Sequence, residues 1–198
     1  MTTEPQVVPA SITGDPTRYQ GSVDDHHFGS GDPYTLGVEE EYMLLDPDSF
    51  DLVQHIDTVL AAVSGHALEP QITSELMQSV LEIATPICRT AGDVMRELTT
   101  LRGYVCSTAR DSGLRVGSAG THPFSRWEGR EEMLAQYRQM AEDAQVVARR
   151  ILAFGVRIHI GVEDRDLAID VMNTLRYVLP HIFCLSTSSP FWQGGNTG

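Results

Sequence analysis

Three consecutive glutamates, Glu39 to Glu41, lie inside an apolar stretch that runs from Tyr34 to Asp46. The apolar residues on both sides are typical of a β-strand, in which successive side chains point to opposite faces of the sheet. Glu39 and Glu41 therefore share one face, about 6.6 Å apart at a rise of about 3.3 Å per residue, and Glu40 points to the other. Two buried like charges need a counter-ion. The run predicts either a cation site or an edge strand with a solvated acidic face.

Two later strand-like segments carry polar side chains in the same kind of setting. Glu82 lies in an apolar run that ends at Pro86, and His159 alternates with apolar residues between Arg157 and Val162. One acid in a strand is ordinary, but recurrence in several strands indicates a shared cation site. Carboxylate oxygens are hard donors that suit Mg²⁺ or Mn²⁺. The predicted metal ligands are Glu39, Glu41, Glu82 and His159.

Composition restricts the class of protein and its partners. The chain has 198 residues, of which 41% are hydrophobic and 21% charged, which is enough for one sizeable core. The net charge of -13 argues against nucleic acid or an anionic membrane surface as a partner. The same acidity is compatible with ATP, because metal ions and a few arginines can neutralise the phosphates locally.

The N-terminus and the cysteines predict a cytoplasmic protein. Residues 1–33 are polar and rich in Pro, Gly and Asp, so we expect a flexible leader, followed by one domain over residues 34–198. The sequence has no apolar segment of membrane-spanning length. Cys88, Cys106 and Cys184 are odd in number and widely spaced, which predicts reduced thiols in the core.

Strands alternate with helices along the chain, which predicts the α+β or α/β class. A turn at residues 46–49 should join the first strand to a short partner strand at 51–54. Capping residues and apolar spacing place the helices. The expected helices run from Thr58 to Ser64 with Asp57 as N-cap, from Thr90 to Ser112 with Gly113 as stop, from Arg130 to Ala153, and from Asp164 to Leu179, where Pro180 should bend or interrupt the last.

Six short motifs occur in an order and spacing that resemble the glutamate–cysteine ligase type 2 family of carboxylate–amine ligases. They are Leu36-Gly-Val-Glu-Glu-Glu-Tyr42, Ser74-Glu-Leu with Leu81-Glu-Ile-Ala-Thr-Pro86, Gly120-Thr-His-Pro123, Ile158-His-Ile-Gly-Val162, Asp164-Arg-Asp166, and Ser188-Ser-Pro-Phe-Trp192 with Gly195-Asn-Thr-Gly198. The resemblance implies a glutamine-synthetase-like catalytic domain of the α+β class, with a curved antiparallel sheet backed by helices. Family members are roughly twice as long. Residues 34–198 would then be the N-terminal half of a domain that looks truncated.

The resemblance also implies a reaction. ATP would phosphorylate a carboxylate to an acyl phosphate, and an amine would attack it to form an amide, with glutamate and cysteine as the nominal substrates and Mg²⁺ or Mn²⁺ as cofactor. Glu39, Glu41 and Glu82 match the metal-binding acids of the family. His159 lies where the wider superfamily has a His-x-His pair, but Arg157 stands at the first position and could instead bind a phosphate or carboxylate.

The remaining site candidates are basic or lie in the last motif. Arg157 and Arg165 are the predicted catalytic residues, although Asp164 to Asp166 also suit simple helix capping. Nucleotide contacts are expected from Arg157, Ser188, Ser189 and Trp192.

The competing interpretation is a truncated, non-catalytic remnant that binds metal or nucleotide, or serves a structural role, without the C-terminal half of the active site. An incomplete sheet would leave a strand edge uncovered, which predicts a homo-oligomer.

Overall fold

A computed structural model describes residues 31–75, 77–126 and 153–197. Most of the expected leader and residues 130–152 of the expected third helix lie outside these ranges, whereas Ala153, its expected last residue, forms a β-bridge with Thr121. The order of elements is the predicted alternation of strands and helices, and every strand pairing is antiparallel. The α+β class and the antiparallel sheet backed by helices are therefore confirmed.

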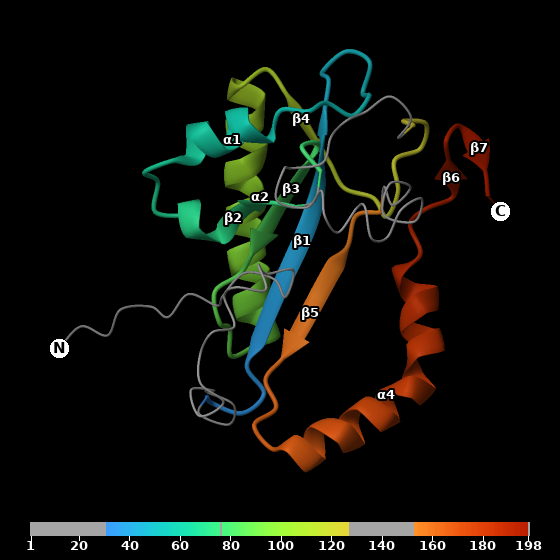
Figure 1. Cartoon of the computed structure of the whole chain (residues 1–198). Helices are drawn as coiled ribbons and strands as arrows, with labels where there is room; N and C mark the ends of the chain where they lie inside the picture. Colours follow the sequence, from blue (N-terminus) through green and yellow to red (C-terminus); the bar gives the residue numbers. More distant parts are fainter. Residues whose placement is uncertain (1–30, 76, 127–152, 198) are drawn as a thin grey trace, which may run out of the picture.

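Strand β1 (Leu36–Leu45) is the centre of the main sheet (Figure 1). Along one edge it pairs with β3 (Val80–Ala84), which in turn pairs with β2 (Ile72–Ser74). Its other edge is shared by β5 (Val156–Ile160), opposite residues 36–40, and β4 (Arg115–Gly117), opposite residues 43–45. The two strands that carry Glu82 and His159 thus both pair directly with β1.

Helices α1 (Ile56–Val63) and α2 (Ala91–Asp111) cover one face of this sheet (Figure 1). Their apolar sides pack on the β1 and β3 residues that point to the same face, among them Leu44 and Leu81, both fully buried. Alternation along β1 sends Val38 and Tyr42 into this core and leaves Glu39 and Glu41 on the opposite face. The helices therefore fix which face of the sheet is left for the acids.

The termini of α2 are those predicted. The Thr90 hydroxyl accepts a hydrogen bond from the Asp93 amide, and the Asp93 carboxylate accepts one from the Thr90 amide, which is a capping box. Gly113 follows the helix with φ of 77°, a left-handed conformation that favours glycine.

A second apolar cluster lies on the acid-bearing face. It contains Met43, two residues after Glu41 on β1, and Val80, two residues before Glu82 on β3, packed with Leu45, Leu52, Met77 and Phe154. Leu45 and Leu52 form an antiparallel bridge, and the Asp46 side chain caps the turn between them, so the expected hairpin is reduced to one bridge.

Helix α4 (Arg165–Ser186) follows β5 and leads to the hairpin of β6 (Phe191–Trp192) and β7 (Gly195–Asn196) (Figure 1). Asp164 caps α4 through its carboxylate, as expected. Pro180 lies inside the helix, which continues to Ser186, so of the two expected effects of this proline the interruption is wrong. A 3-10 turn, η2 (Glu69–Gln71), precedes β2.

Two further expectations are wrong. The N-cap of α1 is His55, and Asp57 lies in the first turn, where its charge still suits the helix dipole. Cys88 is buried, but Cys106 and Cys184 are exposed on helices; all three are free thiols.

In the described part of the chain, no helix combines the length and apolar character needed to cross a membrane.

Candidate functional site

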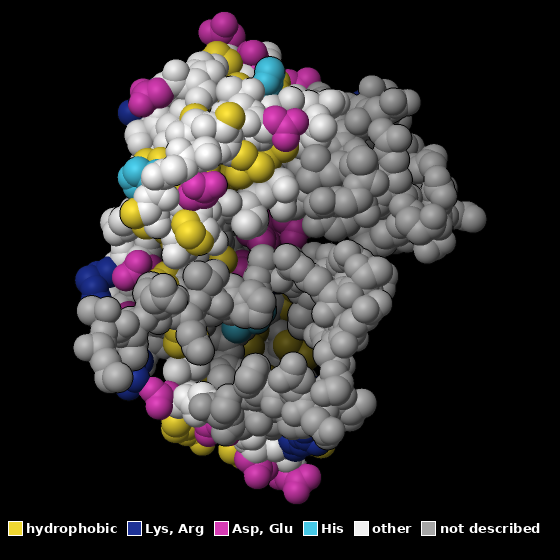
Figure 2. Space-filling view, turned by 60° about the vertical axis from the view of Figure 1, so that its left-hand side comes forward, with side chains coloured by type: hydrophobic (Ala, Val, Ile, Leu, Met, Phe, Trp, Pro, Cys, Tyr) yellow, Lys and Arg dark blue, Asp and Glu magenta, His cyan; other side chains and the backbone are white. Residues whose placement is uncertain are grey.

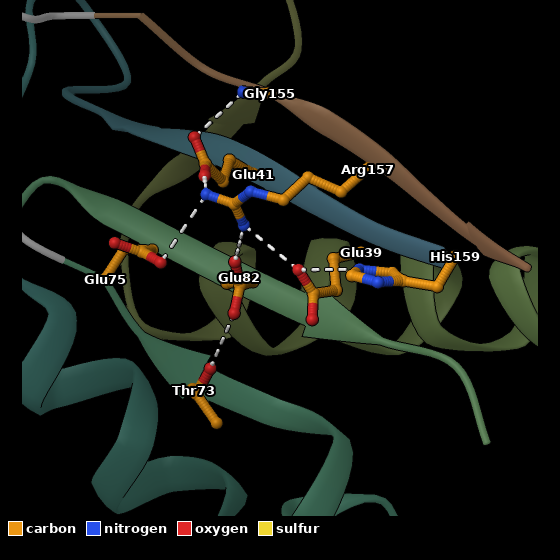
Figure 3. A network of polar contacts seen from close by, with 8 residues as sticks. All are labelled: Glu39, Glu41, Thr73, Glu75, Glu82, Gly155, Arg157 and His159. Carbon is orange, nitrogen blue, oxygen red and sulfur yellow. Dashed lines mark hydrogen bonds and ion pairs between the residues drawn. The ribbon is translucent and has the colours of Figure 1, made fainter. Parts of the chain in front are cut away.

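Four carboxylates converge on the acid-bearing face, the side of the sheet opposite α1 and α2 (Figure 3). Glu41 of β1 and Glu82 of β3 are direct cross-strand partners, and Thr73 of β2 continues the same row. Glu39 lies two residues before Glu41, and Glu75 follows the end of β2. Like charges directly opposite each other in a sheet are destabilising, so this arrangement requires a positive partner.

Arg157 of β5 supplies that positive charge. It lies opposite Glu39 across the β1–β5 pairing, and its guanidinium reaches into the middle of the four acids (Figure 3). Nη1 donates to Glu82 Oε2 at 2.6 Å and to Glu39 Oε2 at 3.1 Å, whereas Nη2 donates to Glu41 and lies 3.7 Å from Glu75 Oε1. One guanidinium therefore contacts every acid of the group.

Further hydrogen bonds fix the orientation of the carboxylates. The Gly155 amide donates to Glu41 Oε2 at 2.8 Å, and the Thr73 hydroxyl donates to Glu82 Oε1 at 3.4 Å. His159 Nε2 lies 3.4 Å from Glu39 Oε2, at the rim of the group. The prediction that Glu39, Glu41 and Glu82 share a face with Arg157 and His159 is confirmed.

Burial changes the protonation of this group. Desolvation raises the pKa of Glu82 to about 7, and it also raises the pKa of Glu41 even though Gly155 and Arg157 oppose the effect. Burial alone would lower the pKa of Arg157, but the charge of Glu41 and the hydrogen bonds to Glu82 and Glu39 raise it. Arg157 thus stays positively charged, while Glu41 and Glu82 hold a proton more readily than exposed glutamates do.

Glu40 belongs to a separate network on the helix-covered face. Its carboxylate accepts hydrogen bonds from Tyr42 and from Arg102 of α2, whose Nε donates at 2.8 Å to Glu40 Oε2. Although burial opposes it, these bonds hold the pKa of Glu40 below its usual value. The third glutamate of the acidic run therefore has a structural partner of its own.

The carboxylate oxygens on the acid-bearing face fit a divalent cation. One carboxylate oxygen each from Glu41, Glu75 and Glu82 lie within 4.8 Å of one another. Oxygen ligands of this kind suit Mg²⁺ or Mn²⁺. A cation already stands among them in the form of the Arg157 guanidinium, which shows that the space accepts positive charge.

The other predicted site residues lie away from these acids. Ser188 accepts a hydrogen bond at 3.1 Å from the Gly120 amide, and Ser189 lies against the same glycine. Trp192 packs on the apolar cluster that contains Met43, so it lies on the acid-bearing face. Arg165 begins α4, beyond the end of β5 and outside the network of Figure 3.

Glu75 and Arg102 were not predicted as members of these networks. Glu75 lies two residues after Thr73, so continued alternation beyond β2 would have placed it beside Glu82. Arg102 looks like a solvent-facing helix residue, yet it reaches from α2 to β1 and pairs with Glu40.

In space-filling view, acidic side chains gather near the middle of one face, and others are spread around its periphery (Figure 2). The distribution agrees with the net charge of -13.

Comparison with known proteins assigns the chain. Residues 35–198 match the sequence profile described as "Glutamate-cysteine ligase family 2". The chain belongs to this family. It is 42% identical over 167 residues to "Putative glutamate–cysteine ligase 2" of Herpetosiphon aurantiacus and 44% identical over 167 residues to the protein of the same name in Roseiflexus castenholzii. These alignments cover 84% of this chain but 43% and 44% of the two relatives, so the chain spans less than half their length.

Two solved structures show the same fold. A glutamate–cysteine ligase from Francisella tularensis, in complex with AMP, aligns with a TM-score of 0.52 and 15% identity over 73% of this chain and 30% of its own. A bifunctional glutathione synthetase from Pasteurella multocida aligns with a TM-score of 0.51 and 16% identity, over 72% of this chain and 18% of its own. This member of glutamate–cysteine ligase family 2 therefore shares its fold with these two distant enzymes.

Proposed function

We propose that this chain carries one wall of the active site of an ATP-dependent carboxylate–amine ligase. The observation that carries the proposal is the convergence of Glu39, Glu41, Glu75 and Glu82 with Arg157 on one sheet face. Family membership supports a ligase, and the AMP complex of a distant ligase of the same fold supports a nucleotide as one of its ligands.

The residues of the acid-bearing face suit phosphoryl transfer to a carboxylate. A divalent cation held by Glu41, Glu75 and Glu82 would neutralise charge that develops on the phosphate oxygens. Glu39 and His159 would line the rim of that site. Arg157 would bind an anionic group of the nucleotide or of the acid substrate, since a guanidinium binds phosphate or carboxylate with two hydrogen bonds.

The segment around Gly120 and Ser188 would contact the nucleotide. Thr121 donates from its hydroxyl to the Phe191 carbonyl at 3.0 Å, and the Gly194 amide donates to the Pro123 carbonyl at 2.8 Å, so the β6–β7 hairpin is docked on this loop. Trp192 would offer a partly buried aromatic surface beside the acid-bearing face. Arg165, at the N-terminus of α4, would contact substrate that lies near Ile160, the last residue of β5.

A chimeric protein tests this function. Residues 35–198 of this chain would replace the matching segment of the Roseiflexus castenholzii relative, and ADP release would be measured with ATP, Mg²⁺, glutamate and cysteine. We expect ADP release that depends on both amino acids. Loss of at least about a hundredfold is expected for Glu82→Gln, since phosphoryl transfer depends on metal placement.

The exposed Asp48→Asn serves as the matched control and should retain the activity of the chimera. An active unmodified relative beside an inactive chimera, or a fully active Glu82→Gln chimera, would contradict the assignment of this site.

A further inference from the structure

Arg157 occupies the position that a divalent cation needs. Its two terminal nitrogens contact Glu39, Glu41, Glu75 and Glu82, and three of these acids are the candidate metal ligands. We infer that Arg157 is a tethered counter-ion that a metal must displace, and that metal binding thereby releases the guanidinium to bind an anionic ligand. The inference rests on the metal site of the proposed function, and it adds the order of events there.

The charges explain why the arginine stands there. Without a positive group, the four carboxylates would face one another across neighbouring strands at low solvent exposure; Glu82 is 2% exposed. Such a group is strongly disfavoured, whereas one guanidinium with donors on two nitrogens can bond several carboxylates at once. Arg157 therefore stabilises the metal-free site.

Metal and guanidinium cannot use the same oxygens together. A divalent cation binds carboxylate oxygen at about 2.0 to 2.6 Å. Arg157 Nη1 lies 2.6 Å from Glu82 Oε2, and Nη2 donates to Glu41, so a metal bound at these oxygens would stand where the guanidinium nitrogens now lie. Their like charges would also repel at this distance. Binding of one therefore removes the other.

The structure leaves Arg157 a route out. Its side chain is 41% exposed, whereas those of Glu41 and Glu82 are 9% and 3% exposed. Among the described residues β5 pairs only with β1, so the strand lies at an edge of the sheet. The long arginine side chain can turn to solvent on the same face without a change in the backbone. There it would meet the phosphate or carboxylate of a ligand that approaches the metal.

Metal affinity gives the first test, on the 198-residue chain. Mn²⁺ binding would be measured by calorimetry and by the electron paramagnetic resonance of free Mn²⁺, for wild type, Arg157→Ala and Arg89→Ala. Arg89 pairs with Asp32 at the surface, so its variant removes one positive charge away from the acids. We expect Kd to fall by about tenfold or more in Arg157→Ala, the equivalent of about 1.4 kcal/mol. We expect no change in Arg89→Ala.

An unchanged or weaker Mn²⁺ affinity in folded Arg157→Ala would overturn the inference, because it would mean that the arginine does not compete. Binding by Arg157→Ala with none by wild type would support it. Absence of Mn²⁺ binding in both proteins would instead refute the metal site of the proposed function.

The position of the guanidinium gives the second test, which uses the wild-type protein and does not depend on the folding of a variant. The Nε–H signal of Arg157 would be assigned by nuclear magnetic resonance from its through-bond correlations to the backbone of Arg157, and followed as Mg²⁺ is added. We expect this signal to shift and its exchange with water to accelerate. The Arg102 signal, from the pair with Glu40 on the other face, should stay unchanged. A protein that binds Mg²⁺ while its Arg157 signal stays fixed would disprove displacement.

Discussion

Glu40 and Glu41 are consecutive residues of β1, and their carboxylates pair with different arginines on opposite faces of the sheet. Glu40 pairs with Arg102 of α2 on the helix-covered face, and Glu41 pairs with Arg157 of β5 on the acid-bearing face. The alternation of a strand thus divides one acidic run between two ion-pair networks, one with Arg102 on the helix-covered face and one with Arg157 on the acid-bearing face.

The first prediction concerns the structural pair. Arg102→Ala should lower the free energy of unfolding by about 2 kcal/mol or more, because Glu40, with an 8% exposed side chain, loses its charged partner. Arg102 itself is 46% exposed, which keeps the loss below the value of a fully buried pair.

Urea denaturation would measure this change. Arg89→Ala, which breaks an exposed pair with Asp32, should cost less than about 1 kcal/mol and serves as the control. Equal effects of the two substitutions would show that the Arg102 pair is no more than a surface contact.

The second prediction concerns metal. Mg²⁺ or Mn²⁺ at a hundredfold excess over Kd should raise the free energy of unfolding by about 2.7 kcal/mol. Glu41→Gln and Glu82→Gln should lose most of this gain, because each replaces a negatively charged candidate ligand with a neutral amide. Thermal unfolding with and without metal would measure it, with Asp48→Asn as a control that keeps the full gain. The same gain in wild type and in a Glu39→Ala/Glu41→Ala double variant would exclude these ligands.

The third prediction concerns pH. Glu82 has a pKa of about 7 in the folded protein because it is buried, against an ordinary value of 4.5. The folded state therefore holds this proton more tightly than the unfolded state does. The resulting stabilisation is fully present below about pH 4.5 and is lost as the pH rises through about 7.

The free energy of unfolding of the metal-free protein should thus fall by about 1 to 3 kcal/mol between pH 5 and pH 8. Asp93, whose pKa is lowered to about 2 by its hydrogen bond from Thr90, titrates below this window and does not contribute. Urea denaturation at several pH values in the presence of a chelator would measure the slope. Glu82→Gln should flatten it, and a slope that survives this substitution would place the titration elsewhere.

The fourth prediction concerns turnover by the 198-residue chain alone. It supplies acids and one arginine on a single sheet face, and it spans less than half the length of its curated relatives. Phosphoryl transfer needs metal ions and basic groups placed together around the phosphate. We therefore expect ADP release at least about a hundredfold slower than that of the chimera. Equal rates in the two proteins would mean that the described residues already form a complete site.

Alternation alone was enough to predict that Glu39 and Glu41 share a face, since period-two patterns are fixed by strand geometry. Glu82 was added because acids recur in apolar strands, and the register that pairs it with Glu41 is known from the structure. Capping chemistry was enough for α2, where Thr90, Asp93 and Gly113 each have a local role. Such local rules depend on a few neighbouring residues and hold wherever those residues occur.

Long-range pairings were less accessible from the sequence. The Arg102 partner is 62 residues away in the chain, and only the packing of α2 on β1 brings the two together. Glu75 was missed because it lies just beyond a three-residue strand, where alternation is too short to recognise. The central position of Arg157 depends on the register of β5, which places it opposite Glu39 and which no local pattern determines.

Helix α4 has no buried residue along its 22-residue length. It nevertheless carries large apolar side chains, and those of Ile169, Met172 and Phe183 are each more than half exposed. A helix without tertiary packing is marginally stable in water. Its amide protons should therefore exchange through local opening, whereas those of α2 should require unfolding of the sheet. Trypsin would then cleave after Arg176 well before Arg102. The larger product would keep β1 to β5, and with them every carboxylate around Arg157.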